Sequence, residues 1–192
     1  MFVLRIGENM RQAIILSGAG GQGLILAGAI LAEAAGVFEE QEVVQTQAYG
    51  IQARGGASQS SVIISDQQIK YPEVLVPDIL LCLSQEAYNR YEPNLRAGGT
   101  LLIDQDLVTP TNPQENIRLI SLPFTAQAEK MERRILANVI ALGALAVITG
   151  VVQVESLARA LPRRLPERNV PQALIALELG KKLAETQGLV LA

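Results

Sequence analysis

Apolar positions along the chain form short runs that are separated by glycine, proline and polar turns. These runs are rich in Val, Ile and Leu, which is typical of β-strands, and they cover residues 12–17, 42–47, 60–65, 78–84, 98–104 and 117–123. The run at 78–84 is apolar almost throughout, which predicts a central strand covered on both faces.

Helical patterns follow several of these runs and dominate after residue 125. The predicted helices cover residues 22–35, 85–96 with an interruption near Pro93, 126–149, 154–161 and 171–187. The helix at 22–35 is almost wholly apolar and small, so we expect it to be buried with its backbone close to a sheet. Strands that alternate with helices predict one α/β domain over residues 1–192. We expect a three-layer α/β/α fold with a mostly parallel sheet and a C-terminal helical segment.

The overall composition limits the partners and the compartment. The formal net charge is −3 and no basic stripe is evident, which argues against nucleic acid as the main partner. The longest apolar stretch, 135–148, is too short to span a bilayer and contains Asn138. We see no signal-peptide pattern, and the single cysteine, Cys82, fits a reducing compartment. We therefore expect a cytoplasmic protein.

The residue types that are missing limit the chemistry further. The chain has no histidine, which excludes a Ser-His-Asp or Cys-His nucleophile built from this chain alone. One cysteine cannot hold an iron–sulfur cluster or a thiolate zinc site. We expect Cys82 to be a small buried apolar residue. The sequence thus predicts no catalytic residue and no metal ligand in this chain.

A glycine cluster follows the first predicted strand. Gly18, Gly20 and Gly23 fit G-x-G-x-x-G, with Gly21 and Gln22 between them. Glycine permits close approach to the backbone, and free N–H groups at the start of a helix favour an anion such as phosphate.

Binding of NAD needs a second element that the sequence lacks. An acidic residue should end the second strand, but that strand ends VVQTQAYG, and Glu39, Glu40 and Glu42 lie at or before its start. Three interpretations of the loop remain: a tight turn for packing, a site for a phosphate-bearing ligand, or a contact for the backbone of a partner subunit.

A second glycine cluster contains Arg54, Gly55 and Gly56. Arg54 offers a fork of donors suited to carboxylate or phosphate. Because loops after parallel strands gather at one edge of a sheet, we expect the two clusters to share a surface. A flexible connection with a solvated arginine is the alternative.

Some polar and small residues in the C-terminal half predict contacts. Asn138 lies in an apolar helix and must find hydrogen-bond partners, either backbone groups or a neighbouring helix. Gly143 in the same helix indicates a close helix contact. The arginines of RALPRRLPER predict a solvated face or a rim contact: Arg159, Arg163, Arg164 and Arg168.

Four segments in order carry a resemblance to a known family. SGAGGQGLILAGAILAEAA, QAYGIQARGGASQSSVIIS, YPEVLVPDILLCLSQEAYNRYEPNLRAGGTLLID and NVIALGALAVITGVV resemble the gamma subunit of 2-oxoacid:ferredoxin oxidoreductases. The resemblance implies a multi-subunit enzyme that oxidatively decarboxylates a 2-oxoacid, transfers the acyl group to coenzyme A and reduces ferredoxin. The N-terminal segment IILSGAGGQG is more similar to gamma subunits of the 2-oxoglutarate type than to those of the pyruvate type.

The resemblance also implies where the cofactors and partners are. Thiamine diphosphate and iron–sulfur clusters would lie on the alpha, beta and ferredoxin-like subunits, with no cofactor held tightly by this chain. Coenzyme A can bind at the interface, beside Gly18, Gly20, Gly21, Gln22, Gly23, Arg54, Gly55 and Gly56. The isolated chain is expected to be inactive, and its exposed partner surface would allow a homodimer. Ala48, Ile51 and Gln52 depart from the family pattern near the second cluster.

Two other functions fit the G-x-G-x-x-G loop. An NAD(P)-dependent dehydrogenase would bind nicotinamide cofactor without a partner. A stand-alone nucleotide-binding module would gain thermal stability on binding its ligand, again without a partner.

Overall fold

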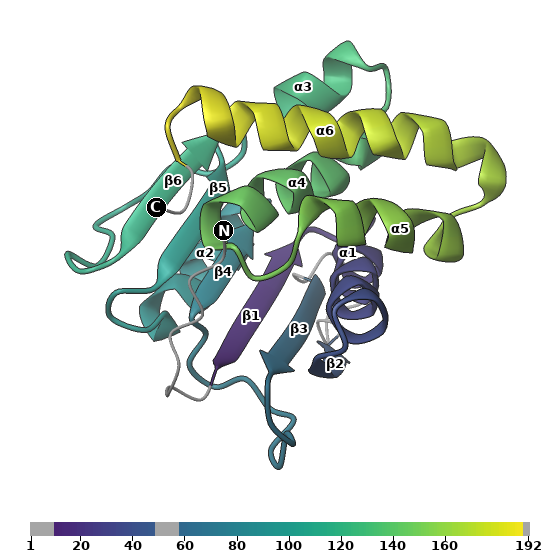
Figure 1. Ribbon diagram of the computed structural model, residues 1–192. Coiled ribbons are helices and arrows are strands. Elements are labelled where there is room, and N and C mark those ends of the chain that lie inside the picture. Colours follow the sequence, from purple (N-terminus) through teal and green to yellow (C-terminus); the bar gives the residue numbers. More distant parts are fainter. Residues whose placement is uncertain (1–9, 49–57, 190–192) are drawn as a thin grey trace.

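The computed structural model describes residues 10–48 and 58–189. Its strands form one six-stranded sheet in the order β2-β3-β1-β4-β5-β6 (Figure 1). β1 pairs in parallel with β4, β4 with β5, and β5 with β6, whereas β3 runs antiparallel to both β1 and β2. The strand bounds are β1 Arg11–Gly18, β2 Glu42–Ala48, β3 Ser58–Ser65, β4 Ile79–Cys82, β5 Thr100–Asp104 and β6 Arg118–Leu122. Each predicted strand is present.

Within residues 10–48 and 58–189, six α-helices lie on the two faces of the sheet, with short 3₁₀ and π turns between or after some of them. Their bounds are α1 Leu24–Glu33, α2 Gln85–Tyr91, α3 Phe124–Lys130, α4 Ala137–Thr149, α5 Val154–Arg164 and α6 Val170–Thr186. No helix in the described ranges is long and apolar enough to cross a membrane.

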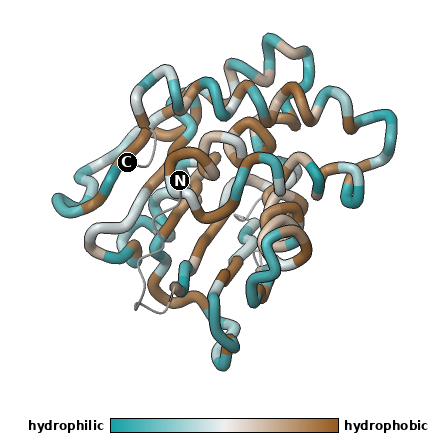
Figure 2. The backbone as a smooth tube through the Cα atoms, viewed as in Figure 1, coloured by the Kyte–Doolittle hydropathy of each residue, from teal (hydrophilic) through white to brown (hydrophobic). Residues whose placement is uncertain are grey.

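The sheet is covered unequally on its two faces. On one face, Ile14 and Leu16 of β1 belong to the same apolar core as residues of α1, α3, α4, α5 and α6, and α6 packs on α4 and α5. On the other face, Ile15 and Leu80 pack with Tyr88 and Tyr91, so α2 and its following turn form the thinner layer. Figure 2 shows hydrophobic stretches along the central strands and the helices over them. The predicted three-layer α/β/α fold is confirmed.

The single long helix predicted over 126–149 is wrong. The chain breaks there into α3, a turn, a 3₁₀ segment at Arg134–Leu136 and α4. Glu132 adopts φ 55°, a left-handed conformation that no helix continues, and Arg133 N–H bonds back to the carbonyl of Ala128 at 3.1 Å. Local propensity gave no sign of this break, because residues 131–136 contain no glycine or proline.

Small residues bring α1 close to the sheet, as predicted. A Cβ on Gly28 would overlap the hydroxyl of Ser60 in β3. Gln45 of β2 bridges the same contact, because its Nε2 donates to the Ile25 carbonyl at 3.1 Å and to Ser60 Oγ at 2.9 Å.

α4 and α6 run side by side and parallel (Figure 1). A Cβ on Gly143 would overlap the carbonyl oxygen of Leu177, and a Cβ on Gly180 would overlap that of Ile140. The two backbones are therefore in direct contact, which confirms the close helix contact predicted for Gly143.

Glu33, at the end of α1, is paired with two consecutive arginines of α5. Its side chain is only 4% exposed, and Arg163 Nε and Arg164 Nε donate to its two carboxylate oxygens. Both arginines remain partly exposed, as expected of a solvated face, but their pairing with Glu33 was not predicted from the sequence. They tie α5 to α1 because a buried carboxylate needs its charge compensated.

Replacement of Glu33 by glutamine is expected to lower the free energy of unfolding by about 2 kcal/mol. This loss is smaller than for most broken buried ion pairs, because both arginines that lose their partner can be solvated by water. Burial raises the pKa of Glu33, but hydrogen bonds and charges from Arg163 and Arg164 outweigh it, so the pKa lies below its usual 4.5. The stabilisation is therefore present above pH 4.5 and is lost as the pH falls through the folded-state pKa. The melting temperatures of wild type and Glu33→Gln should differ at pH 7 and converge in acid; a constant difference would contradict this.

Candidate functional site at the carboxyl edge of the sheet

The glycine loop, residues 18–23, lies where β1 ends and α1 begins. Gly18 is paired with Ser58, the first residue of β3, and Ala48, the last residue of β2, is paired with Gln59. The chain therefore leaves β2 and re-enters β3 beside the glycine loop. Arg54, Gly55 and Gly56 lie between these points but outside the described residues, so the surface that they share with the glycine loop stays a prediction.

Gln22 closes the glycine loop on itself. Its Oε1 accepts the N–H of Ala19 at 2.7 Å, and its Nε2 donates to the carbonyl of Leu83 at 2.8 Å. A Cβ on Gly18 would collide with the Gln22 amide oxygen, so this glycine makes room for the glutamine. In a dinucleotide-binding turn, backbone donors of this kind point at pyrophosphate. Here one of them is bound by an amide of the chain itself, which disfavours the dehydrogenase interpretation.

Gly20 and Gly21 form the exposed tip of the loop. A Cβ on either would meet no atom within 4 Å, and Gly21 has φ +88°. The first turn of α1 receives no side-chain cap from the part of the chain that the structure describes. Leu26, one turn into α1, is 36% exposed, and Ile135 is 52% exposed. The tip is thus bare backbone with apolar side chains nearby, a surface suited to a partner or ligand.

Asn138 anchors the other end of the loop. It lies in the first turn of α4, and its Nδ2 donates to the carbonyls of Gln22 at 3.0 Å and Gly23 at 3.1 Å. Gly23 has φ +74°, and a Cβ there would collide with this amide. The prediction that Asn138 bonds backbone is confirmed.

Replacement of Asn138 by aspartate should be strongly destabilising although the two side chains have almost the same shape. The two donated hydrogen bonds are lost, and a carboxylate then faces two carbonyl oxygens. We expect a loss of about 2–3 kcal/mol in the free energy of unfolding. Urea denaturation measures it, with Asn94→Asp at an exposed position in the turn after α2 as the control. A loss equal to that of the control would show that the anchor contributes nothing.

A polar network on the α2 face holds the start of β3 beside the loop. Ser17 Oγ donates to the Ser58 carbonyl at 2.9 Å, and the Tyr91 hydroxyl donates to Gln59 Oε1 at 2.9 Å. Burial raises the pKa of Tyr91, partly offset by the charge of Arg90, so the hydroxyl stays protonated and remains a donor. Sequence reasoning missed Tyr91 and Gln59, because their contact joins segments 32 residues apart that no motif links.

The described groups at this edge can bind but offer little for proton or electron transfer. Cys82, at the end of β4, is fully buried, and burial raises the pKa of its thiol far above the usual range. It is therefore an inert small residue, as predicted. Within residues 10–48 and 58–189, no group of three or more His, Cys, Asp or Glu side chains is placed to hold a metal ion.

Comparisons with known proteins show the family of the chain. The sequence pattern of the family described as pyruvate ferredoxin/flavodoxin oxidoreductase matches residues 13–183. The chain is 46% identical over 179 residues to the 2-oxoglutarate synthase subunit KorC of Methanocaldococcus jannaschii, covering 92% of this chain and 96% of the relative.

Solved structures show the same fold. The keto/oxoacid ferredoxin oxidoreductase gamma subunit from Geobacter sulfurreducens superposes with a TM-score of 0.83 at 43% identity, covering 92% of this chain and 98% of that one. The 2-oxoglutarate:ferredoxin oxidoreductase from Magnetococcus marinus matches with a TM-score of 0.80 at 23% identity, which shows the fold alone. That match covers 93% of this chain but only 32% of the longer one.

The fold and the described part of the site define a class of α/β domain in which a bare glycine turn lies at the carboxyl edge of the sheet. The chain belongs to the pyruvate ferredoxin/flavodoxin oxidoreductase family, and within it corresponds to a gamma subunit of a 2-oxoacid:ferredoxin oxidoreductase complex.

Proposed function

We propose that the complex containing this chain oxidises 2-oxoglutarate, forming succinyl-coenzyme A and CO₂ and passing the electrons to ferredoxin. The observation that carries this choice is the 46% identity, over almost the whole chain, to a 2-oxoglutarate synthase subunit. The match to a pyruvate synthase subunit is weaker, at 29% identity over 169 residues.

The role of this chain is to present the glycine loop to a partner subunit and to help shape the coenzyme A site. The exposed tip at Gly20 and Gly21 supports it, because bare backbone lets another molecule approach to hydrogen-bond distance. Gln22 and Asn138 keep the tip in one conformation before the partner arrives, which reduces the entropy lost on binding. Arg54, Gly55 and Gly56 complete this site by offering donors for phosphate or carboxylate.

The remaining chemistry belongs to the other subunits. Thiamine diphosphate and the iron–sulfur clusters lie on alpha, beta and ferredoxin-like partners in the cytoplasm, and this chain holds no cofactor tightly. The buried, protonated state of Cys82 supports this assignment, because iron is bound by thiolate rather than thiol.

Anaerobic purification of the tagged chain from its own cells tests the proposal. We expect a stoichiometric complex with larger subunits that bind thiamine diphosphate and clusters, and coenzyme A-dependent ferredoxin reduction that is faster with 2-oxoglutarate than with pyruvate. Recovery of the chain alone would refute the subunit role. A complex that prefers pyruvate would refute only the choice of substrate.

A further inference from the structure

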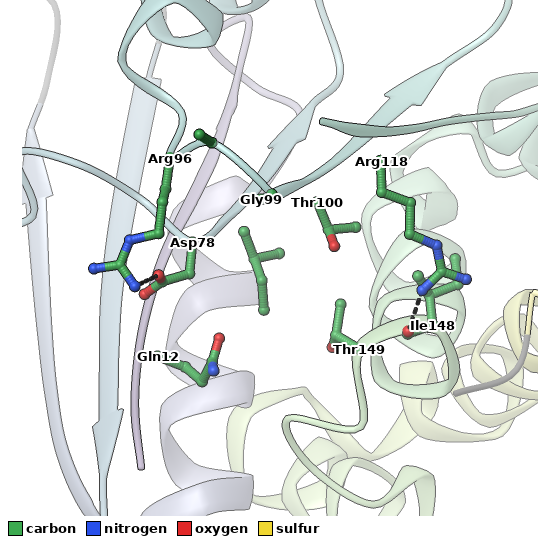
Figure 3. Close-up of a pocket in the computed structure, with 11 residues that line it drawn as sticks. Gln12, Asp78, Arg96, Gly99, Thr100, Arg118, Ile148 and Thr149 are labelled. Carbon is green, nitrogen blue, oxygen red and sulfur yellow. Dashed lines mark hydrogen bonds and ion pairs between the residues drawn. The ribbon is translucent and has the colours of Figure 1, made fainter. Parts of the chain in front are cut away.

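A polar cavity opens at the edge of the sheet opposite the glycine loop, where the parallel strands begin (Figure 3). Its volume is about 270 Å³, room for roughly nine water molecules and slightly less than a typical site for a drug-sized ligand. The residues that line it and carry the argument are Gln12, Asp78, Arg96, Thr100, Arg118 and Thr149. The cavity suits a small molecule rather than a nucleotide.

Two arginines and one carboxylate give this cavity an excess of positive charge. Asp78 is neutralised, because Oδ1 pairs with Arg96 at 2.7 Å and Oδ2 accepts the Ala13 N–H at 2.8 Å. Arg118 has no carboxylate partner among the residues that the structure describes. It donates to the carbonyls of Ile148 at 3.2 Å and Leu189 at 3.3 Å, and within residues 10–48 and 58–189 its other guanidinium N–H groups have no hydrogen-bond acceptor.

Neutral polar groups lie between the two arginines. Figure 3 shows the Gln12 amide beside the Arg96–Asp78 pair and the Thr100 side chain nearer to Arg118. In the described part of the chain neither side chain has a hydrogen-bond partner, although both are partly buried. A half-buried amide and hydroxyl that face a cavity are satisfied by water or by a ligand.

We propose that this cavity binds a small anion that carries a carboxylate or a phosphate group. The free guanidinium donors of Arg118 compensate its charge, and Thr100 and Gln12 donate to its remaining oxygens. The site uses no residue of the glycine loop. The test of this site is therefore independent of the test of the proposed function.

Calorimetry on the full chain, with succinate and inorganic phosphate as probes in a low-chloride buffer, tests the site. We expect a dissociation constant of about 1 mM or below for at least one probe. The probe that binds more tightly identifies the carboxylate or the phosphate as the preferred group. Binding should weaken as sodium chloride is added, since salt screens the charge of partly exposed arginines. Failure of both probes to bind would overturn the proposal.

Two matched variants separate the cavity from general charge effects. Gln12→Glu adds a carboxylate inside the cavity and should weaken binding at least about tenfold. Gln105→Glu makes the same change at an exposed position after β5, and should leave binding unchanged. Thr100→Val removes an unpartnered hydroxyl without changing the shape of the side chain, and it should weaken binding of the anion as Gln12→Glu does. Equal affinities in Gln12→Glu and Gln105→Glu would place the anion elsewhere and refute the site.

Discussion

Replacement of Gly180 by alanine is expected to reduce the free energy of unfolding by about 3 kcal/mol or more, the upper range for an overpacked core. The added Cβ would overlap the carbonyl oxygen of Ile140 and lie 3.0 Å from the amide nitrogen of Ala144, so only a shift of a whole helix can make room. In an exposed helix the same change would stabilise the protein, because alanine has the higher helix propensity. The sign of the effect therefore measures how closely α4 and α6 pack.

Urea denaturation of Gly180→Ala and Gly143→Ala measures this effect, and Gly20→Ala is the control. A Cβ on Gly20 meets no atom within 4 Å, so that variant should change stability by no more than about 0.5 kcal/mol. If Gly180→Ala were as stable as the control, the direct contact between the two helix backbones would be disproved.

The element types were predictable from the sequence because most elements have strong local patterns. The apolar run at 78–84 contains β4, and the small apolar segment at 22–35 contains α1. The order of strands was not predictable in detail. β3 is inserted between β2 and β1 as an antiparallel strand, and this depends on pairing between residues such as Gly18 and Ser58 that are 40 positions apart. No local periodicity encodes such a pairing.

The shape of the glycine loop was predictable from the sequence, but its internal contacts were not, and its role as a binding site stays a prediction. The glycine spacing indicated a turn with exposed backbone, and Gly20 and Gly21 provide one. The sequence did not show that Gln22 would bind the Ala19 N–H and so take a position that a phosphate could occupy. That hydrogen bond depends on the conformation of the whole loop, which Asn138 fixes from α4, 115 residues beyond Gly23.

The paired arginines show a similar limit. RALPRRLPER has the composition of a solvated face, and Arg163 and Arg164 are 59% and 45% exposed at their side chains. Only the fold shows that both donate to the buried Glu33, because α5 crosses the end of α1. A charge pattern in one segment cannot predict a partner that lies 130 residues away in sequence.

Replacement of Gly20 by leucine should impair either assembly of the complex or coenzyme A binding while the fold stays intact. The position has open space around it and its φ is not in the left-handed region, so stability should change by about 0.5 kcal/mol or less. The leucine covers the bare backbone that we propose a partner or coenzyme A approaches. We expect either failure of the complex to assemble in anaerobic purification or an increase of at least about tenfold in the KM for coenzyme A, since blocking a central binding group typically costs more than about 1.4 kcal/mol.

The choice of Gly20 rather than Gly21 makes this test specific. Gly21 has φ +88°, so a side chain there would strain the loop as well as cover it, and the two effects could not be separated. Asn94→Leu, an exposed substitution in the turn after α2, controls for added surface hydrophobicity and should leave assembly and kinetics unchanged. The KM then distinguishes the two occupants: an assembled complex with a raised KM places coenzyme A at the glycine loop, and failed assembly places a subunit there. A Gly20→Leu complex with normal assembly and normal KM would remove the glycine loop from the site, because nothing that binds could tolerate a leucine over the backbone that it approaches.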